Sequence, residues 1–483
     1  MQTRGRASWA VWRYKDHVRT RVTLIGLVWV LGSLPAHAQT ESHPVPQQDA
    51  NARQGALDLP EALVAARANY PSLEAADQAI RAAQARLTEA SLSPYFQFRG
   101  TAGFGLAPEA FGTPIFSRDS QLPVDNPWRP TVQVGISGVV PLYTFGLLPA
   151  ARAAADAGLA AARQDRIRRS AQLAYDVRRA YLGLQLALDV RQMIAEGSRH
   201  LRRAQRELQE RLEDGEEDVD ETDVYRLASA EAEITVRSSE AQALEAISRE
   251  ALALLTGIEA PTIPECPIQV VAVEIREVAP LLEAGDSSAD AAMLDALVRA
   301  RDAGVRASRA SLLPAFGVGL SASQAHSPGI TDQTNPFVHD PGNRTGFTAG
   351  LLASWSLDVP GGLARLRRSQ AEASRARAQR SEALLGIRLR TMTAFHQLED
   401  AIRRVAAWGG AERSTRQWFV ATAQAYQLGT SDADDLIDAI SAYFEARYNA
   451  LQATHDHNLG VARLERVTGL PLTEDQDWSA HCE

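Results

Sequence analysis

Residues 81–105 read RAAQARLTEASLSPYFQFRGTAGFG, and residues 299–323 read RARDAGVRASRASLLPAFGVGLSAS. Both stretches begin with an alanine- and arginine-rich helical pattern, continue through Leu-x-Pro and end in an alternating apolar pattern. Pro94 and Pro314 are expected to end the helices, because proline lacks an N–H donor and clashes with the preceding turn. The repetition predicts that the chain consists of two copies of one structural unit.

The two copies also end alike, because residues 223–257 and 435–469 have the same length and both finish with Thr-Gly. Each copy therefore predicts a helix, two strands, a long helix, a turn and a further helix. In the first copy these elements are expected at 57–92, 95–105, 131–142, 147–214 and 222–257. In the second copy they are expected at 286–312, 315–323, 346–357, 363–428 and 435–469. The chain divides accordingly into a signal peptide at 1–38, a disordered segment at 39–56, repeats at 57–257 and 278–469, a linker at 258–277 and a tail at 470–483.

The long helices are too long for a globular core. A helix of about 68 residues extends about 100 Å at 1.5 Å per residue. Its partners must run alongside it, as in a coiled coil. The two shorter helices of each copy add up to the length of the long one, so we expect them to lie end to end along it. An ordinary coiled-coil protein would account for these helices and would leave the strands unexplained.

The four strands alternate apolar and polar residues, which is the pattern of a sheet with two different faces. The first sets Phe96, Phe98 and Phe104 against Gln97 and Arg99. Four such runs in an exported chain predict membrane strands. Four strands cannot close a barrel by themselves, and lipid excludes open sheet edges. The chain is therefore expected to oligomerise, with eight strands in a dimer or twelve in a trimer, and twelve leave room for a channel.

The first residues predict export. Six basic side chains precede an apolar run of 13 residues at 22–34, and Ala36-His37-Ala38 offers a cleavage site. The run is short of the ~20 residues that span a bilayer, and no later stretch of 18 apolar residues follows. Cleavage would change the formal net charge from -9 to -14 by removing six basic and one acidic side chains. The acidic balance argues against nucleic acid as a partner.

Several segments resemble the TolC-like outer membrane efflux protein family over nearly the whole mature length. Residues 435–447 (DLIDAISAYFEAR), continuing to 467–469 (VTG), are similar to the family's most specific block. Residues 222–224 are its counterpart in the first repeat, and 141–146 (PLYTFG) and 357–362 (LDVPGG) resemble the strand-to-helix junctions. The resemblance implies a homotrimer with a 12-stranded transmembrane β-barrel in the outer membrane of a Gram-negative bacterium. It also implies an α-helical tunnel in the periplasm, a periplasmic adaptor protein and an inner-membrane pump of RND, ABC or MFS type.

The turns between the long helices and their successors lie at the end remote from the strands. Residues 210–223 hold nine acids and one arginine. Asp435 and Asp438 are three residues apart and share a helix face, so in a trimer each would form a ring that attracts cations. Charge alone also fits a solvated acidic turn. The family pattern favours a pore constriction, because both residues match its inner-mouth aspartates.

The resemblance further implies a gate in which Tyr426 reaches Asp223, beside Thr222. Gly215 and Gly429 begin the turns to which an adaptor would dock, although glycine also suits such turns by geometry alone. A family arginine is replaced here by Ser431, so the family's charged latch is in doubt and closure is expected to depend more on Tyr426.

Other sites are weakly indicated. Cys266 and Cys482 follow helix ends that should be neighbours, so a disulfide or two free thiols remain as alternatives. The sequence 455–457 (HDH) is expected at the surface, since residues two apart do not share a helix face.

No catalytic, cofactor or metal motif appears, so we expect no enzyme. A periplasmic adaptor is the alternative function, although it should have a lipoyl-like β-domain. The exported substrate, whether a drug, a metal ion or a protein, is not readable.

Overall fold

The computed structural model describes residues 56–108, 127–213, 221–274, 277–328, 342–428, 430–431 and 433–473. The expected signal peptide, nearly all of the 39–56 segment and most of the C-terminal tail lie outside the described residues. None of the described helices is long and apolar enough to cross a lipid bilayer.

The first repeat contains all the elements that its sequence predicts, with one additional break. They are α1 (Leu59–Asn69), α2 (Pro71–Leu92), a 3-10 turn η1 (Ser93–Tyr95), β1 (Phe98–Pro108), β2 (Trp128–Tyr143), α3 (Leu147–Glu213) and α4 (Glu221–Thr256). The single helix expected at 57–92 is interrupted at Tyr70, whose backbone is extended with φ -77° and ψ 118°. Pro71 explains this break, because a residue that precedes proline is driven out of the helical region.

The second repeat follows the same order. Its elements are α5 (Ala279–Asp286), α6 (Ala289–Ala310), β3 (Ala315–His326), β4 (Arg344–Ser354), α7 (Val359–Gln427) and α8 (Ala433–Thr468). The helix expected at 286–312 begins only at Ala289, because the Ser288 hydroxyl accepts a hydrogen bond from the Ala291 N–H (3.5 Å) and caps a new helix start.

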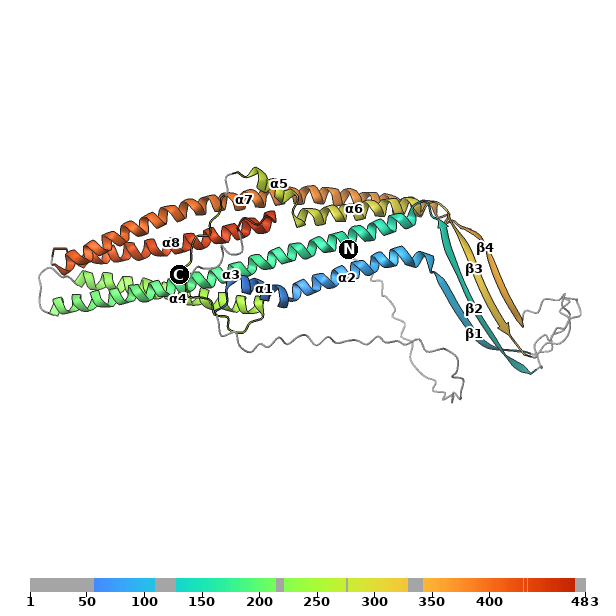
Figure 1. The fold of residues 1–483 in the computed structure, drawn as a ribbon, viewed down its shortest axis with the longest axis horizontal. Coiled ribbons are helices and arrows are strands. Elements are labelled where there is room, and N and C mark those ends of the chain that lie inside the picture. Colours follow the sequence, from blue (N-terminus) through green and yellow to red (C-terminus); the bar gives the residue numbers. More distant parts are fainter. Residues whose placement is uncertain are drawn as a thin grey trace, which may run out of the picture. The chain divides into compact units, whose positions relative to one another are not determined.

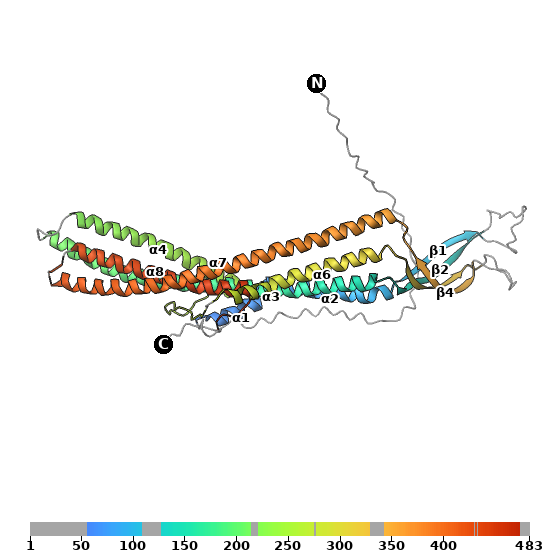
Figure 2. The ribbon, with the colours of Figure 1, turned by 90° about the horizontal axis from the view of Figure 1, so that it is seen from above.

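The two long helices carry the shorter ones. α3 packs against α2, α4 and α6, and α7 packs against α6 and α8. Figures 1 and 2 show α2 and α4 following one another along α3, and α6 and α8 following one another along α7. This is the end-to-end arrangement that the helix lengths predict. The largest buried cluster includes Leu184, Leu252, Leu398 and Leu464, and most of its residues come from α1, α3, α4, α7, α8 and the linker.

The linker between the repeats is bound to this buried cluster by polar side chains. Residues 259–274 form no helix or strand in the structure. The Ile268 N–H donates to a carboxylate oxygen of Asp189 at 2.8 Å. Asn458 accepts from the Val271 N–H at 3.0 Å and donates to the carbonyl of Gln269 at 2.8 Å. The linker therefore binds helices of both repeats, α3 and α8.

The four strands form one antiparallel sheet in the order β1-β2-β3-β4. Directly opposed residues lie on the same face, so the register assigns the faces. One face is apolar over most of its area. It carries Phe98, Ala102, Phe104, Leu106, Trp128, Val132, Val134, Ile136, Val140, Val318, Leu320, Ala322, Phe347, Ala349 and Leu351. Gln324, His326 and Thr345 are polar exceptions at the end remote from the helices.

The opposite face is polar or small except near the helices, where Val139, Pro141 and Leu352 lie on it. It carries Arg99, Thr101, Gly103, Gly105, Arg129, Thr131, Gln133, Gly135, Ser137, Gly319, Ser321, Ser323, Arg344, Gly346, Thr348 and Gly350. The sequence pattern predicts this division, and the register confirms that the apolar stripes of all four strands coincide. Within the described residues, no strand pairs with the outer edge of β1 or of β4.

The junction from β2 to α3 depends on unusual backbone angles. Phe145 has φ 49° and Gly146 has φ 90°. Positive φ is favourable for glycine and rare for other residues. The tight change of direction from sheet to helix therefore explains the glycine that ends the PLYTFG segment at 141–146.

Candidate functional site

The first turns of α8 contain the two aspartates that the sequence selects. α7 has 69 residues and begins just after β4, so α8 begins about 100 Å from the sheet at 1.5 Å per residue. Asp435 and Asp438 are both exposed, whereas Leu436, Ile437, Ala439 and Ile440 are buried on the opposite side of the helix. The two carboxylates thus share one solvent-facing surface at the tip.

Local contacts hold the Asp435 carboxylate at the start of α8. The Ser431 hydroxyl donates to its Oδ2 at 3.0 Å. A carboxylate in the first turn also interacts favourably with the positive end of the helix dipole. Ser431, where the resemblance leads us to expect an arginine, is an uncharged residue that binds the aspartate.

An ion pair that sequence reasoning missed joins the two helix pairs at this tip. The Arg226 guanidinium on α4 contacts the Asp434 carboxylate on α8. Their side chains are 52% and 45% exposed, so the contact lies at the surface. Two sequence positions could have indicated this pair. Arg226 comes three residues after Asp223, and Asp434 directly precedes Asp435.

The expected gate residues are only partly described. Tyr426 is half-buried in the last turn of α7, and Thr222 is exposed in the first turn of α4. The side chain of Asp223 and both turn glycines, Gly215 and Gly429, lie outside the described residues. The contact from Tyr426 to Asp223 and the docking role of the two glycines therefore stay predictions.

Aromatic rings join the two helix pairs behind the tip. The Phe444 ring on α8 covers Gly197 on α3, where an added Cβ would lie 3.3 Å from the ring carbons. Phe419 on α7 stacks on Tyr443 with 5.8 Å between the ring centroids, and His200 on α3 meets Phe419 edge-on at 5.4 Å. Arg447 on α8 also pairs with Glu196 on α3 at 2.6 Å. Helices α3, α7 and α8 are thus bound together next to the acidic surface.

Buried polar groups cluster near the linker. Burial raises the pKa of Asp189 to about 6, although the Ile268 N–H and the charge of Arg447 favour its ionised form. Glu465 on α8 is buried and pairs with Arg178 on α3 at 2.6 Å. Its other oxygen accepts from the Leu472 N–H at 2.9 Å. These carboxylates fix backbone segments, so they have a structural role.

The histidine pair on α8 does not lie at the surface as expected. His457 is 3% exposed, and burial lowers its pKa. His455 contacts Asp456 at 3.4 Å, and this hydrogen bond together with Arg404 lowers the pKa of Asp456 to about 2. The surface interpretation was wrong because α8 packs against α7, α3 and the linker, which leaves little of this part of the helix exposed.

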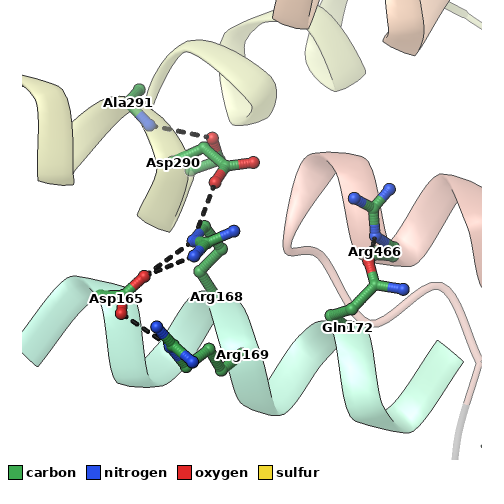
Figure 3. A network of polar contacts seen from close by, with 8 residues as sticks. Asp165, Arg168, Arg169, Gln172, Asp290, Ala291 and Arg466 are labelled. Carbon is green, nitrogen blue, oxygen red and sulfur yellow. Dashed lines mark hydrogen bonds and ion pairs between the residues drawn. The ribbon is translucent and has the colours of Figure 1, made fainter. Parts of the chain in front are cut away.

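A further network connects three helices in the half of the molecule nearer the sheet (Figure 3). Asp165 on α3 binds Arg168 at 2.6 Å and Arg169 at 2.7 Å. Burial opposes its charge, but the two arginines outweigh this effect and lower its pKa. Arg168 also faces Asp290 on α6 at 3.8 Å, and Arg466 on α8 donates to Gln172 on α3 at 2.5 Å.

One of the two cysteines lies within the described residues. Cys266 is buried in the linker, at 9% exposed, and Cys482 lies outside the described residues. Their disulfide stays a prediction. Within the described ranges, no group of three or more histidine, cysteine, aspartate or glutamate side chains could hold a metal ion.

The sequence comparison finds one family. The model of the outer membrane efflux proteins matches residues 62–257 and 283–470, one segment in each half of the chain. No curated protein sequence matches the chain significantly.

Solved structures share the fold at low sequence identity. The outer-membrane channel OprN is 20% identical with a TM-score of 0.70, over 85% of this chain and 89% of that one. VceC from Vibrio cholerae is 17% identical with a TM-score of 0.69, over 85% and 96%. The open-state channel MtrE from Neisseria gonorrhoeae is 16% identical with a TM-score of 0.70, over 86% and 90%.

Proposed function

The chain belongs to the outer membrane efflux protein family, a family of transport channels, and from this premise we propose that three copies form the exit duct of an efflux or secretion system. Membership locates the protein in the outer membrane.

The observation that carries the proposal is the sheet with one apolar face, one polar face and two outer edges without a partner among the described strands. An open edge is excluded in lipid, so the β1 edge of one protomer needs the β4 edge of another. Three copies give twelve strands, whose polar faces enclose a water-filled lumen.

The strand lengths fit a membrane crossing. β1 and β4 each have 11 residues, which extend about 36 Å and cover about 28 Å when tilted by about 40°. The apolar band of an outer-membrane barrel is about 25 Å tall. Three aromatic side chains are exposed at the ends of the sheet: Trp128 at one end, and Tyr143 and Trp355 at the other. Tyrosine and tryptophan rings favour both membrane interfaces.

In this trimer, the helices continue the barrel as a tunnel in the periplasm, and their tips meet at its inner mouth. Asp435 and Asp438 would each contribute a ring of three carboxylates there. Such rings attract cations and repel anions at a narrow passage. A periplasmic adaptor would dock at the turns of Gly215 and Gly429 and separate the helix pairs, which connects the duct to an inner-membrane pump. An adaptor function for this chain itself is disfavoured, because the family match extends over both repeats.

The function is tested on the full-length protein expressed in a Gram-negative host. We expect it in the outer-membrane fraction as an oligomer whose gel mobility changes on heating, and we expect the purified oligomer to conduct ions in planar bilayers. Recovery from the periplasm as a non-conducting monomer would refute the proposal.

The constriction is tested by ion selectivity. Replacing Asp435→Asn together with Asp438→Asn should lower the preference for cations, because it removes six charges from the mouth of a trimer. The matched control replaces two exposed acids on α2, Glu74→Gln and Glu89→Gln, which removes the same charge far from the tip. Equal selectivity in wild type, the tip variant and the control would contradict the assignment.

A further inference from the structure

Among the described residues, the polar face of the sheet carries positive side chains and no negative ones. The positive side chains are three arginines. In the register, Arg99 opposes Ser137, Arg129 opposes Ala107 and Arg344 opposes Ala325. All three arginines are exposed. The face is therefore positive, in contrast to the acidic surface at the far end of the helices.

The neighbours of Arg99 leave its charge uncompensated. Thr101, Gly135 and Ser137 are the nearest positions on the polar face, on its own strand and on β2. Within the part of the chain that the structure describes, the side chains of Arg99 and Arg344 make no hydrogen bond and no ion pair. An arginine in this setting directs a full positive charge toward the solvent that covers the face.

The ends of the sheet differ in what else is near. Arg129 and Arg344 begin β2 and β4, next to the connections 109–126 and 329–341, which contain acidic residues and lie outside the described residues. Arg99 lies at the other end, one residue into β1 and close to the helices. Arg99 is therefore the arginine whose charge acts on the lumen farthest from the acidic connections.

We propose that the barrel lumen is an anion-preferring segment of the duct and that Arg99 is its main selectivity-determining residue. The proposal rests on the proposed function, because it needs the trimer whose polar faces point inward. It implies that the last segment before the outside attracts negatively charged solutes, in series with a cation-attracting inner mouth.

The dimensions allow these charges to act on the permeating ions. Twelve strands about 4.8 Å apart and tilted by about 40° make a backbone circle of about 12 Å radius. An arginine side chain extends well into that radius, so the remaining distance to the axis is smaller than the Debye length of about 8 Å at physiological salt. Each kT of positive potential changes the ratio of anions to cations about sevenfold, and charged clefts reach potentials of several kT.

The test measures reversal potentials of the purified trimer in planar bilayers under KCl gradients near 10 mM, where the Debye length is about 30 Å. All variants are made in a protein that carries Asp435→Asn and Asp438→Asn, so that the ion selectivity of the tip does not mask that of the barrel. Replacing Arg99→Gln, Arg129→Gln and Arg344→Gln together should lower the chloride-to-potassium permeability ratio several-fold. Arg99→Gln alone should produce the largest single change.

The matched control replaces the same three residues by lysine, which keeps the charge and should keep the permeability ratio. A conducting trimer whose ratio is the same with glutamine as with arginine would overturn the inference and leave the proposed function intact. If the protein that keeps all three arginines forms no channel, both the inference and the proposed function are overturned.

Discussion

The ion pair between Arg226 and Asp434 should hold the inner mouth closed. It joins α4 of one helix pair to α8 of the other, so any separation of the pairs at the tip has to break it. Replacing Arg226→Ala removes the contact while leaving the buried side of α8 unchanged. We therefore expect this variant to open more often than the wild type.

The magnitude follows from the exposure of the pair. With side chains 52% and 45% exposed, one such pair contributes about 0.2–1 kcal/mol. Three symmetric pairs that break together contribute about 0.6–3 kcal/mol, which changes the opening equilibrium by a factor of about 3 to about 150. High salt should reduce the difference between variant and wild type, because it screens exposed charges.

The assay is the open fraction of single channels in planar bilayers. The control is Arg403→Ala, which breaks a 3.1 Å pair with Glu399 of similar exposure inside α7 and does not connect the helix pairs. The exchange of Arg226→Asp with Asp434→Arg should recover closure. An open fraction for Arg226→Ala that equals that of Arg403→Ala would refute the reasoning.

Three further predictions concern stability and covalent structure. Burial raises the pKa of Asp189 from 3.8 to about 6, so its charged form costs stability that increases from about pH 4 to about pH 6. Asp189→Asn should thus stabilise the protein by up to about 3 kcal/mol at pH 7 and hardly at all at pH 4, measured as the melting temperature at each pH; an equal gain at both would contradict this. Leu398→Ala, at a side chain 1% exposed, should cost about 2–5 kcal/mol and lower that temperature by far more than the exposed Leu385→Ala. Non-reducing peptide mapping should recover one peptide pair that joins Cys266 to Cys482, and two separate thiol peptides would refute the bond.

The fold was predictable because its strongest signals are local. Period-two alternation identified the apolar side of each strand, and the register confirms that Phe104, Val132 and Phe347 lie on one face. Helix lengths predicted the end-to-end pairing along α3 and α7. Pro71 could have predicted the break at Tyr70, because a residue before proline is disfavoured in a helix. The cap at Ser288 was not predictable in the same way, because Ser288 lies within a segment whose pattern is helical throughout.

The site was less predictable because its contacts join residues far apart in the sequence. The exposure of Asp435 and Asp438 follows from helix periodicity. The pairing of Arg226 with Asp434 depends on how α4 meets α8, which no local pattern specifies. The burial of His457 likewise depends on the linker and α7, which cover a helix side that its sequence alone marks as polar.

We expect three copies of this chain to close one barrel through the edges of β1 and β4. Native mass spectrometry of the complex extracted from the outer membrane counts the copies directly. We expect a single species with three copies, which supplies twelve strands. A complex of one, two or four copies would contradict this expectation.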